Sequence, residues 1–275
     1  MLLQITNRCR MACPHCMDNA DPNGPMMSMD TCQKAVAFAK DGGARLLIVS
    51  GGEPTEHPQL FDICRLISHA HLNFSLCTNG MFMGDPRKEW ALEKVTRLGG
   101  YCGSQLYTNP KWYRLHRQTI EKYESNRAKY ESWKILLDTT DIRGMKDIGR
   151  AKDNPQALAE AEASPYHNSC LSACLTLVQA ANPKDFFNLM FMQTRFCTPM
   201  VDCVGNVHMS ESWLCPSCGN VNTDSNEDIW LKMRQFRPCG GCIGCRKYLT
   251  ENSPKMAMAR RLLGQATKED YVDGD

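Results

Sequence analysis

Three cysteines, Cys9, Cys13 and Cys16, have a C-x3-C-x2-C spacing that could hold a metal centre within the eight residues CRMACPHC. Three thiolates on one loop can each bind one iron of a cubane [4Fe–4S] cluster, whose usual complement is four cysteines. The fourth iron would then lack a protein ligand, and an open coordination position distinguishes a catalytic metal from a structural one. The alternative is a zinc site completed by His15 or by a distant residue.

A second group of cysteines lies in the last third of the chain. Part of it has the spacing C-x2-C-x20-C-x2-C, which is typical of a structural zinc ribbon. The region holds more cysteines than one zinc ion requires, so an auxiliary iron–sulfur cluster is the other reading. The candidate metal ligands are Cys197, Cys203, Cys215, Cys218, Cys239, Cys242 and Cys245. Cys170 and Cys174 are left unassigned.

The remaining single cysteines lie inside apolar runs and are expected to be small buried hydrophobic residues. They are Cys32, Cys64, Cys77 and Cys102. The start of the sequence has no basic segment followed by an apolar stretch, and no segment approaches the roughly 18 apolar residues that span a bilayer. A cytoplasmic location is therefore expected. Disulfides are rare in that compartment, so the sixteen cysteines are not expected to form a disulfide framework.

The composition is that of a globular protein. The 275 residues are 43% hydrophobic, and 32 Lys and Arg nearly balance 30 Asp and Glu. With so small a net charge, the protein has no overall electrostatic field that would attract nucleic acid or an anionic membrane, so we expect no membrane partner.

Strands and helices are expected to alternate along the first half of the chain. The hydrophobic patterns predict strands within 2–6, 44–54, 73–80, 101–109 and 133–140. They predict helices within 27–43, 57–71, 86–100 and 110–132. Such alternation indicates βαβ units around a parallel sheet, in a full or partial (β/α) barrel. The cysteine trio (Cys9, Cys13 and Cys16) and the segments SGGEP and TNG then lie at the carboxyl ends of strands, where active sites of such folds are found.

The trio after the first strand, together with GGEP at the end of the second, resembles the radical S-adenosylmethionine (SAM) superfamily. The resemblance implies a partial (β/α) barrel, a catalytic [4Fe–4S] cluster on the trio and SAM as cosubstrate. His15 stands where the family usually has an aromatic residue. The resemblance also implies that GGEP receives the methionyl ammonium of SAM, and that polar residues at the next strand ends contact SAM. The implied SAM-binding residues are His15, Gly51, Gly52, Glu53, Asn79 and Ser104.

The late cysteines resemble the SPASM or twitch extensions that carry auxiliary clusters in this superfamily. Ser210 stands where the SPASM pattern expects a cysteine, so we expect at least one auxiliary cluster, with zinc as the alternative. The expected domains are a core at 1–165, whose boundary could extend to about 195, a small cysteine-rich region at 196–250, and a helix with an acidic tail at 251–275.

The expected reaction is hydrogen abstraction from a peptide or small molecule by a 5′-deoxyadenosyl radical. The expected partners are a flavodoxin- or ferredoxin-type electron donor and the peptide or small-molecule substrate. A peptide would bind either directly in the mouth of the barrel or through a separate recognition protein. A rival reading takes a nucleotide or nucleic acid as substrate, because residues 111–134 hold seven Lys or Arg among aromatic residues. A solvated helix with an aromatic inner stripe explains the same stretch. A zinc-binding module without enzymatic activity is the third reading.

Overall fold

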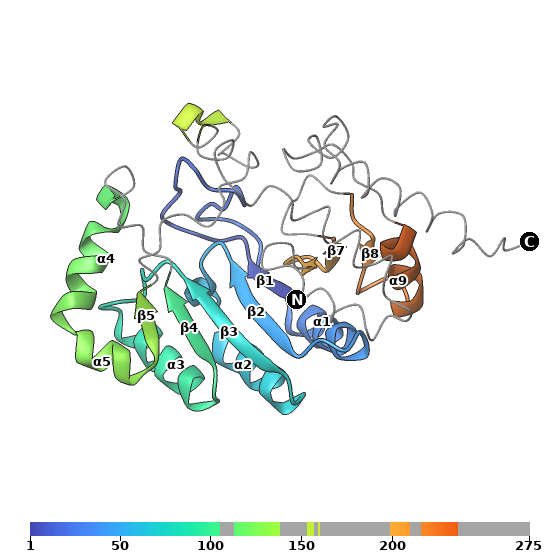
Figure 1. Cartoon of the computed structure of the whole chain (residues 1–275), viewed down its shortest axis with the longest axis horizontal. Coiled ribbons are helices and arrows are strands. Elements are labelled where there is room, and N and C mark those ends of the chain that lie inside the picture. Colours follow the sequence, from blue (N-terminus) through green and yellow to red (C-terminus); the bar gives the residue numbers. More distant parts are fainter. Residues whose placement is uncertain (105–112, 138–152, 157–158, 160–198, 210–215, 236–275) are drawn as a thin grey trace, which may run out of the picture.

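The computed structural model of the chain describes residues 1–104, 113–137, 153–156, 159, 199–209 and 216–235 (Figure 1). The strands are β1 (Leu2–Thr6), β2 (Leu46–Gly51), β3 (Asn73–Thr78), β4 (Tyr101–Ser104), β5 (Ile135–Leu137), β6 (Met200–Val201), β7 (Asn206–His208) and β8 (Gly219–Asn220). The helices are α1 (Met29–Asp41), the 3-10 helix η1 (Pro54–Glu56), α2 (Leu60–His69), α3 (Pro86–Arg97), α4 (Tyr113–Ser125), α5 (Arg127–Ser132) and α9 (Asn226–Gln235).

These strands form one sheet in the order β5-β4-β3-β2-β1-β6-β7-β8. The first five strands are parallel to one another, and helices connect them in sequence. Strand β6 pairs in parallel with β1, and β7 and β8 continue the sheet in antiparallel pairs. The predicted α/β class with a parallel sheet is confirmed, and the carboxyl ends of β1–β5 meet at one edge.

Local signals set most of the helix boundaries. The Ser28 hydroxyl accepts a hydrogen bond from Thr31 N (3.1 Å) and caps α1, as the sequence predicts. Asp85 caps α3 in the same way, with Pro86 in the first turn. The single helix predicted over 110–132 is wrong within the described residues, because Asn126 interrupts it between α4 and α5 with a non-helical φ of −132°. The Asn126 side chain donates to the Lys122 carbonyl instead.

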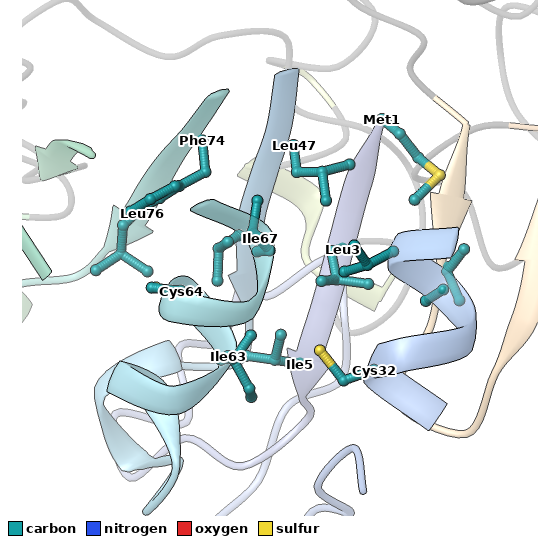
Figure 2. Close-up of a cluster of buried hydrophobic side chains, with 14 of the residues drawn as sticks. Met1, Leu3, Ile5, Cys32, Leu47, Ile63, Cys64, Ile67, Phe74 and Leu76 are labelled. Carbon is teal, nitrogen blue, oxygen red and sulfur yellow. The ribbon is translucent and has the colours of Figure 1, made fainter. Parts of the chain in front are cut away.

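The main core lies between one face of the sheet and helices α1 and α2 (Figure 2). Alternate residues of each strand face these helices, so Leu3 and Ile5 of β1 are fully buried. Cys32, Cys64 and Cys102 also have no exposed surface, which confirms their reading as core residues. Burial raises the pKa of the Cys32 thiol to about 12, so this thiol stays protonated and unreactive. Cys77 differs, because it is partly exposed.

Aromatic residues of α4 and α5 form an inner stripe. Tyr123 and Tyr130 are buried and stack on each other with ring centroids 5.8 Å apart, and Phe82 meets Tyr130 edge-on. Two of the aromatic side chains in the basic stretch 111–134 are thus unavailable to stack on bases. The described residues favour the reading of a solvated helix with an aromatic inner face.

The late strands are held to the core by α9, which the sequence reading did not predict. The Trp230 ring stacks on Phe38 of α1 with centroids 4.5 Å apart. Asn226 Nδ2 donates to Asp41 Oδ2 (2.7 Å) at the end of α1. The predicted boundary at 165–195 lies outside the described residues. Among the residues that the structure does describe, no helix is both long and apolar enough to cross a membrane.

Candidate active site

Hydrogen bonds join the two ends of the loop that carries the cysteine trio. Backbone hydrogen bonds of 2.8 Å join Asn7 N to the Pro25 carbonyl, Cys9 N to the Asp21 carbonyl and Met27 N to the Ile5 carbonyl. The outgoing residues 5–9 therefore run beside the returning residues 21–27. The trio is presented on a closed loop that begins where β1 ends.

Cys9 has a sulfur surrounded by hydrogen-bond donors. The residue is 7% exposed, and its Sγ accepts hydrogen bonds from the backbone N–H groups of Met11 and Ala12. Asn79 Nδ2 lies 3.5 Å from the same sulfur. Burial raises the pKa of Cys9, and the two backbone donors oppose that rise. Hydrogen bonds to ligand sulfurs tune iron–sulfur centres, so these donors fit a metal-bound thiolate.

The other two cysteines of the trio are more open. Cys13 and Cys16 are partly exposed, and Cys16 N donates to the Cys13 carbonyl (3.1 Å). Within the described ranges, no three His, Cys, Asp or Glu side chains converge on a point where they could hold one metal ion.

The two glycines of GGEP allow β2 to approach the trio loop closely. Gly52 N and Glu53 N donate to the carbonyls of Thr6 and Arg8 (both 2.8 Å). A Cβ on Gly51 would lie 2.2 Å from the Thr6 carbonyl oxygen, and one on Gly52 would lie 2.5 Å from the Arg8 carbonyl oxygen. Contacts inside the chain thus explain both glycines, before any contact with SAM is considered.

Glu53 is fully buried and its carboxylate gathers donors from two strand ends. Oε1 accepts from the Thr55 N–H (3.0 Å), the Thr55 hydroxyl (2.6 Å) and the Thr78 hydroxyl (2.8 Å), and Oε2 accepts from Asn79 N (2.8 Å). Burial raises the pKa of Glu53, and these hydrogen bonds oppose the rise. The carboxyl group of Glu53, to which the sequence prediction assigned a negative charge, therefore lies inside the site, where Oε2 keeps capacity for a further donor.

Asn79 connects the trio to GGEP. Its backbone N–H donates to Glu53, its side-chain Nδ2 points at Cys9 Sγ, and its Oδ1 accepts from Met81 N (2.9 Å). Ser104 ends β4 in register with Thr78, so it lies at the same edge of the sheet. His15 is 3% exposed within the trio loop. Cys9, Gly51, Gly52, Glu53, Asn79 and Ser104 thus gather at one edge of the sheet.

Several neighbours of the site escaped the sequence reading. Glu56 is almost buried and forms ion pairs with Arg10 of the trio loop (3.3 Å) and with Lys88 of α3. His57 Nε2 donates to the Met27 carbonyl (2.9 Å), while its Nδ1 accepts from Gln59 N. Both residues lie within three positions after GGEP, and that position was the only signal available.

The described late cysteines lie near the core. Cys203, between β6 and β7, is 3% exposed, and the backbone N–H of Asn7, two residues before Cys9, lies near enough to oppose the rise of its pKa. Burial and the nearby charge of Asp202 raise the pKa of Cys203 to about 11. Cys218 is also buried. The other predicted late ligands, Cys197, Cys215, Cys239, Cys242 and Cys245, lie outside the described residues.

Residues 3–111 match the family model of the Radical SAM superfamily. The PqqA peptide cyclase of Ruegeria pomeroyi is 36% identical over an alignment 122 residues long that covers 38% of this chain and 32% of that cyclase. The GTP 3′,8-cyclase of Desulforamulus reducens is 28% identical over an alignment 156 residues long that covers 53% of this chain and 47% of that enzyme. The chain thus matches about a third of the first relative and about half of the second.

A solved structure, described as native anSMEcpe with bound AdoMet and Cp18Cys peptide, has the same fold. Its TM-score to this chain is 0.54 at 14% identity, and the alignment covers 97% of this chain and 96% of that one. The predicted partial-barrel architecture is confirmed by this likeness.

Proposed function

We propose that this chain, whose residues 3–111 match the family model of the Radical SAM superfamily, cleaves SAM reductively and abstracts hydrogen from a substrate C–H. Cys9, Cys13 and Cys16 would hold the [4Fe–4S] cluster. When bound, the cluster and SAM supply one electron and a 5′-deoxyadenosyl radical, which leaves as 5′-deoxyadenosine after taking a hydrogen atom. The observation that carries the proposal is the contact of the trio loop with GGEP through Asn79 and Glu53.

The chain's own residues would bind and orient the two cofactors. The donors from Met11, Ala12 and Asn79 would stabilise the Cys9 thiolate as a ligand. Glu53 Oε2 would accept the methionyl ammonium of SAM, in keeping with its remaining hydrogen-bonding capacity. Gly51, Gly52, Ser104 and His15 would complete the surroundings of SAM at the same edge.

A peptide is the favoured substrate, and the similarity to a PqqA peptide cyclase supports it. The similarity to a GTP 3′,8-cyclase supports a nucleotide as the second candidate. At least one auxiliary cluster on the late cysteines would take up an electron from the substrate. Cys203 and Cys218 would be ligands to it, with zinc as the alternative metal. We further propose a cytoplasmic location, a flavodoxin- or ferredoxin-type electron donor and a separate peptide-recognition protein.

The direct test is production of 5′-deoxyadenosine from SAM by the anaerobically reconstituted protein with dithionite. The wild type should form the product, and the Cys9→Ala, Cys13→Ala and Cys16→Ala variants should not. Cys32→Ala, which removes a thiol buried in the α1 core, is the matched control and should keep the activity. Product formation by the triple variant would refute the proposal.

Iron, acid-labile sulfide and zinc per chain test the late cysteines. About eight iron atoms would mean one auxiliary cubane, and about twelve would mean two. About four iron atoms with one zinc would leave the radical proposal standing and make the late region a zinc site. Zinc without sulfide would refute both parts.

A further inference from the structure

One polar side chain of β1 is buried without a partner. Gln4 is 1% exposed, and neither its side-chain nitrogen nor its side-chain oxygen has a hydrogen-bond partner among the described residues. A buried amide without partners costs free energy that the native state must offset elsewhere. Such groups are rare in native proteins and call for a specific explanation.

Gln4 belongs to a row of polar or small residues across the sheet. Gln4 is in register with Ser50 of β2, and Cys77 of β3 is in register with Gly103 of β4. Val49 pairs with Leu76, so Ser50 and Cys77 are the next positions of the same ladder. We name Gln4, Ser50, Cys77 and Gly103 the polar row.

The polar row lies on the face of the sheet opposite the helical core. Leu3, Ile5, Leu47 and Leu76 point toward α1 and α2 (Figure 2). Because side chains alternate along a strand, Gln4 and Cys77 point the other way. Barrel interiors are usually filled by bulky branched residues, whereas this row offers a carboxamide, a hydroxyl, a thiol and a glycine.

The row is also close to the motifs of the proposed site. Ser50 directly precedes Gly51 and Gly52, Cys77 is two residues before Asn79, and Gln4 is five residues before Cys9. Each member therefore lies just before the carboxyl end of its strand. A substrate that presents a C–H to a radical formed at this edge would touch the row on the inner face.

We propose that Gln4 is a substrate-binding residue whose carboxamide hydrogen-bonds a main-chain amide of a peptide substrate. A peptide group offers one N–H donor and one carbonyl acceptor, which match the carboxamide of Gln4 in a paired arrangement. The polar row carries no charge, so it suits a neutral peptide group better than the phosphates of a nucleotide. This inference rests on the proposed function.

The test uses thermal unfolding of the anaerobically reconstituted protein with two probes. A pool of tripeptides that are acetylated and amidated at their ends should raise the midpoint of the wild type by about 2–4 °C at saturating concentration. GTP is the second probe. Gln4→Leu and the volume-matched Gln4→Met should lose the tripeptide shift. Gln59→Leu, which alters an exposed glutamine before α2, is the control and should keep it.

Three outcomes would overturn the assignment. They are an equal tripeptide shift in both Gln4 variants, a shift with GTP alone that needs Gln4, and no wild-type shift with either probe. Without ligand, Gln4→Leu should unfold at higher urea than the wild type, because it removes a buried amide without partners. A lower midpoint would mean that the amide is paired within the protein. A separate assay of 5′-deoxyadenosine in the same wild-type preparation tests the proposed function, which fails if this product is absent.

Discussion

At the residue scale, Glu53 holds the site together by accepting four hydrogen bonds without exposure to solvent. Thr55 follows it in sequence, whereas Thr78 and Asn79 belong to the end of β3. The carboxylate therefore ties GGEP to the next strand end. Removing its acceptor oxygens would leave buried donors unsatisfied.

We predict that Glu53→Gln lowers the free energy of unfolding by about 1–3 kcal/mol, because the amide NH2 replaces an acceptor among donors. Urea denaturation of the purified protein measures this. Glu121→Gln, on the exposed face of α4, is the matched control and should change stability by less than about 0.5 kcal/mol. Equal midpoints for both variants would show that the four hydrogen bonds contribute little.

The trio and GGEP could be predicted from the sequence because each motif consists of particular residue types at fixed, short spacings. Partners from other elements were not visible. The hydroxyl of Thr78 reaches Glu53 across 25 positions, and Asn79 reaches Cys9 across 70. The sequence reading found Asn79 as a strand-end polar residue, but nothing in the sequence indicated that it bridges two motifs.

At the element scale, the close approach of β2 to β1 depends on Gly51. This glycine has a φ of +149°, and a Cβ there would overlap the Thr6 carbonyl. We predict that Gly51→Ala destabilises the protein by about 1–3 kcal/mol more than Gly99→Ala. Gly99 also has a positive φ, but open space surrounds its Cβ position. Gly99→Ala therefore measures the free-energy cost of placing alanine at a positive φ without a steric overlap. Urea denaturation measures both variants, and equal losses would contradict the crowding at Thr6.

The stability of the protein should depend on pH through His57, which joins the end of η1 to the residues before α1. Burial lowers the pKa of His57 below its ordinary value of 6.5, while its hydrogen bond to the Met27 carbonyl acts in the opposite direction. The unfolded state then binds a proton more readily than the folded state, so stability is full above about pH 6.5 and falls as the pH drops. We predict that urea midpoints measured from pH 8 to pH 5 decline less in His57→Gln than in the wild type.

The control for that series is His71→Asn, which alters an exposed histidine after α2. It should keep the wild-type pH dependence. A wild-type profile that is flat, or that is unchanged in His57→Gln, would refute the role of His57.

Elements with a clear hydrophobic period were predictable, and short ones were not. The pattern LLQIT predicted β1 with its observed bounds, Leu2–Thr6. Strands β6 and β8 have two residues each, too few to show a period, and their pairing depends on distant partners. The break at Asn126 depends on a side-chain bond to the backbone that propensity alone does not reveal.

At the scale of the whole molecule, α9 packs the late residues against the start of the chain. We predict that Trp230→Ala lowers the free energy of unfolding by about 3–5 kcal/mol, because it removes a buried ring stacked on Phe38. Trp90→Ala, at a residue 57% exposed on α3, should cost less than about 1 kcal/mol. Guanidinium denaturation followed by circular dichroism measures both, and similar losses would show that α9 stabilises the core little.

The match of residues 3–111 to the Radical SAM family model agrees with the prediction drawn from the cysteine trio and GGEP. The substrate could not be predicted from the sequence. In our proposal, substrate specificity depends on residues of the inner sheet face such as Gln4 and Ser50, which look like ordinary strand residues in the sequence. Their shared face and register become visible only in the folded sheet.

The pairing of β1 with β6 has a consequence for biosynthesis. Leu3 is made almost two hundred residues before its neighbour Val201. The edge of β1 that pairs with β6 therefore stays open over that interval, next to the loop that carries the cysteine trio. An open strand edge invites pairing with other chains, and contacts between distant residues form slowly. The strand that leads into the trio loop is thus the one whose edge waits longest for its partner while the chain is made.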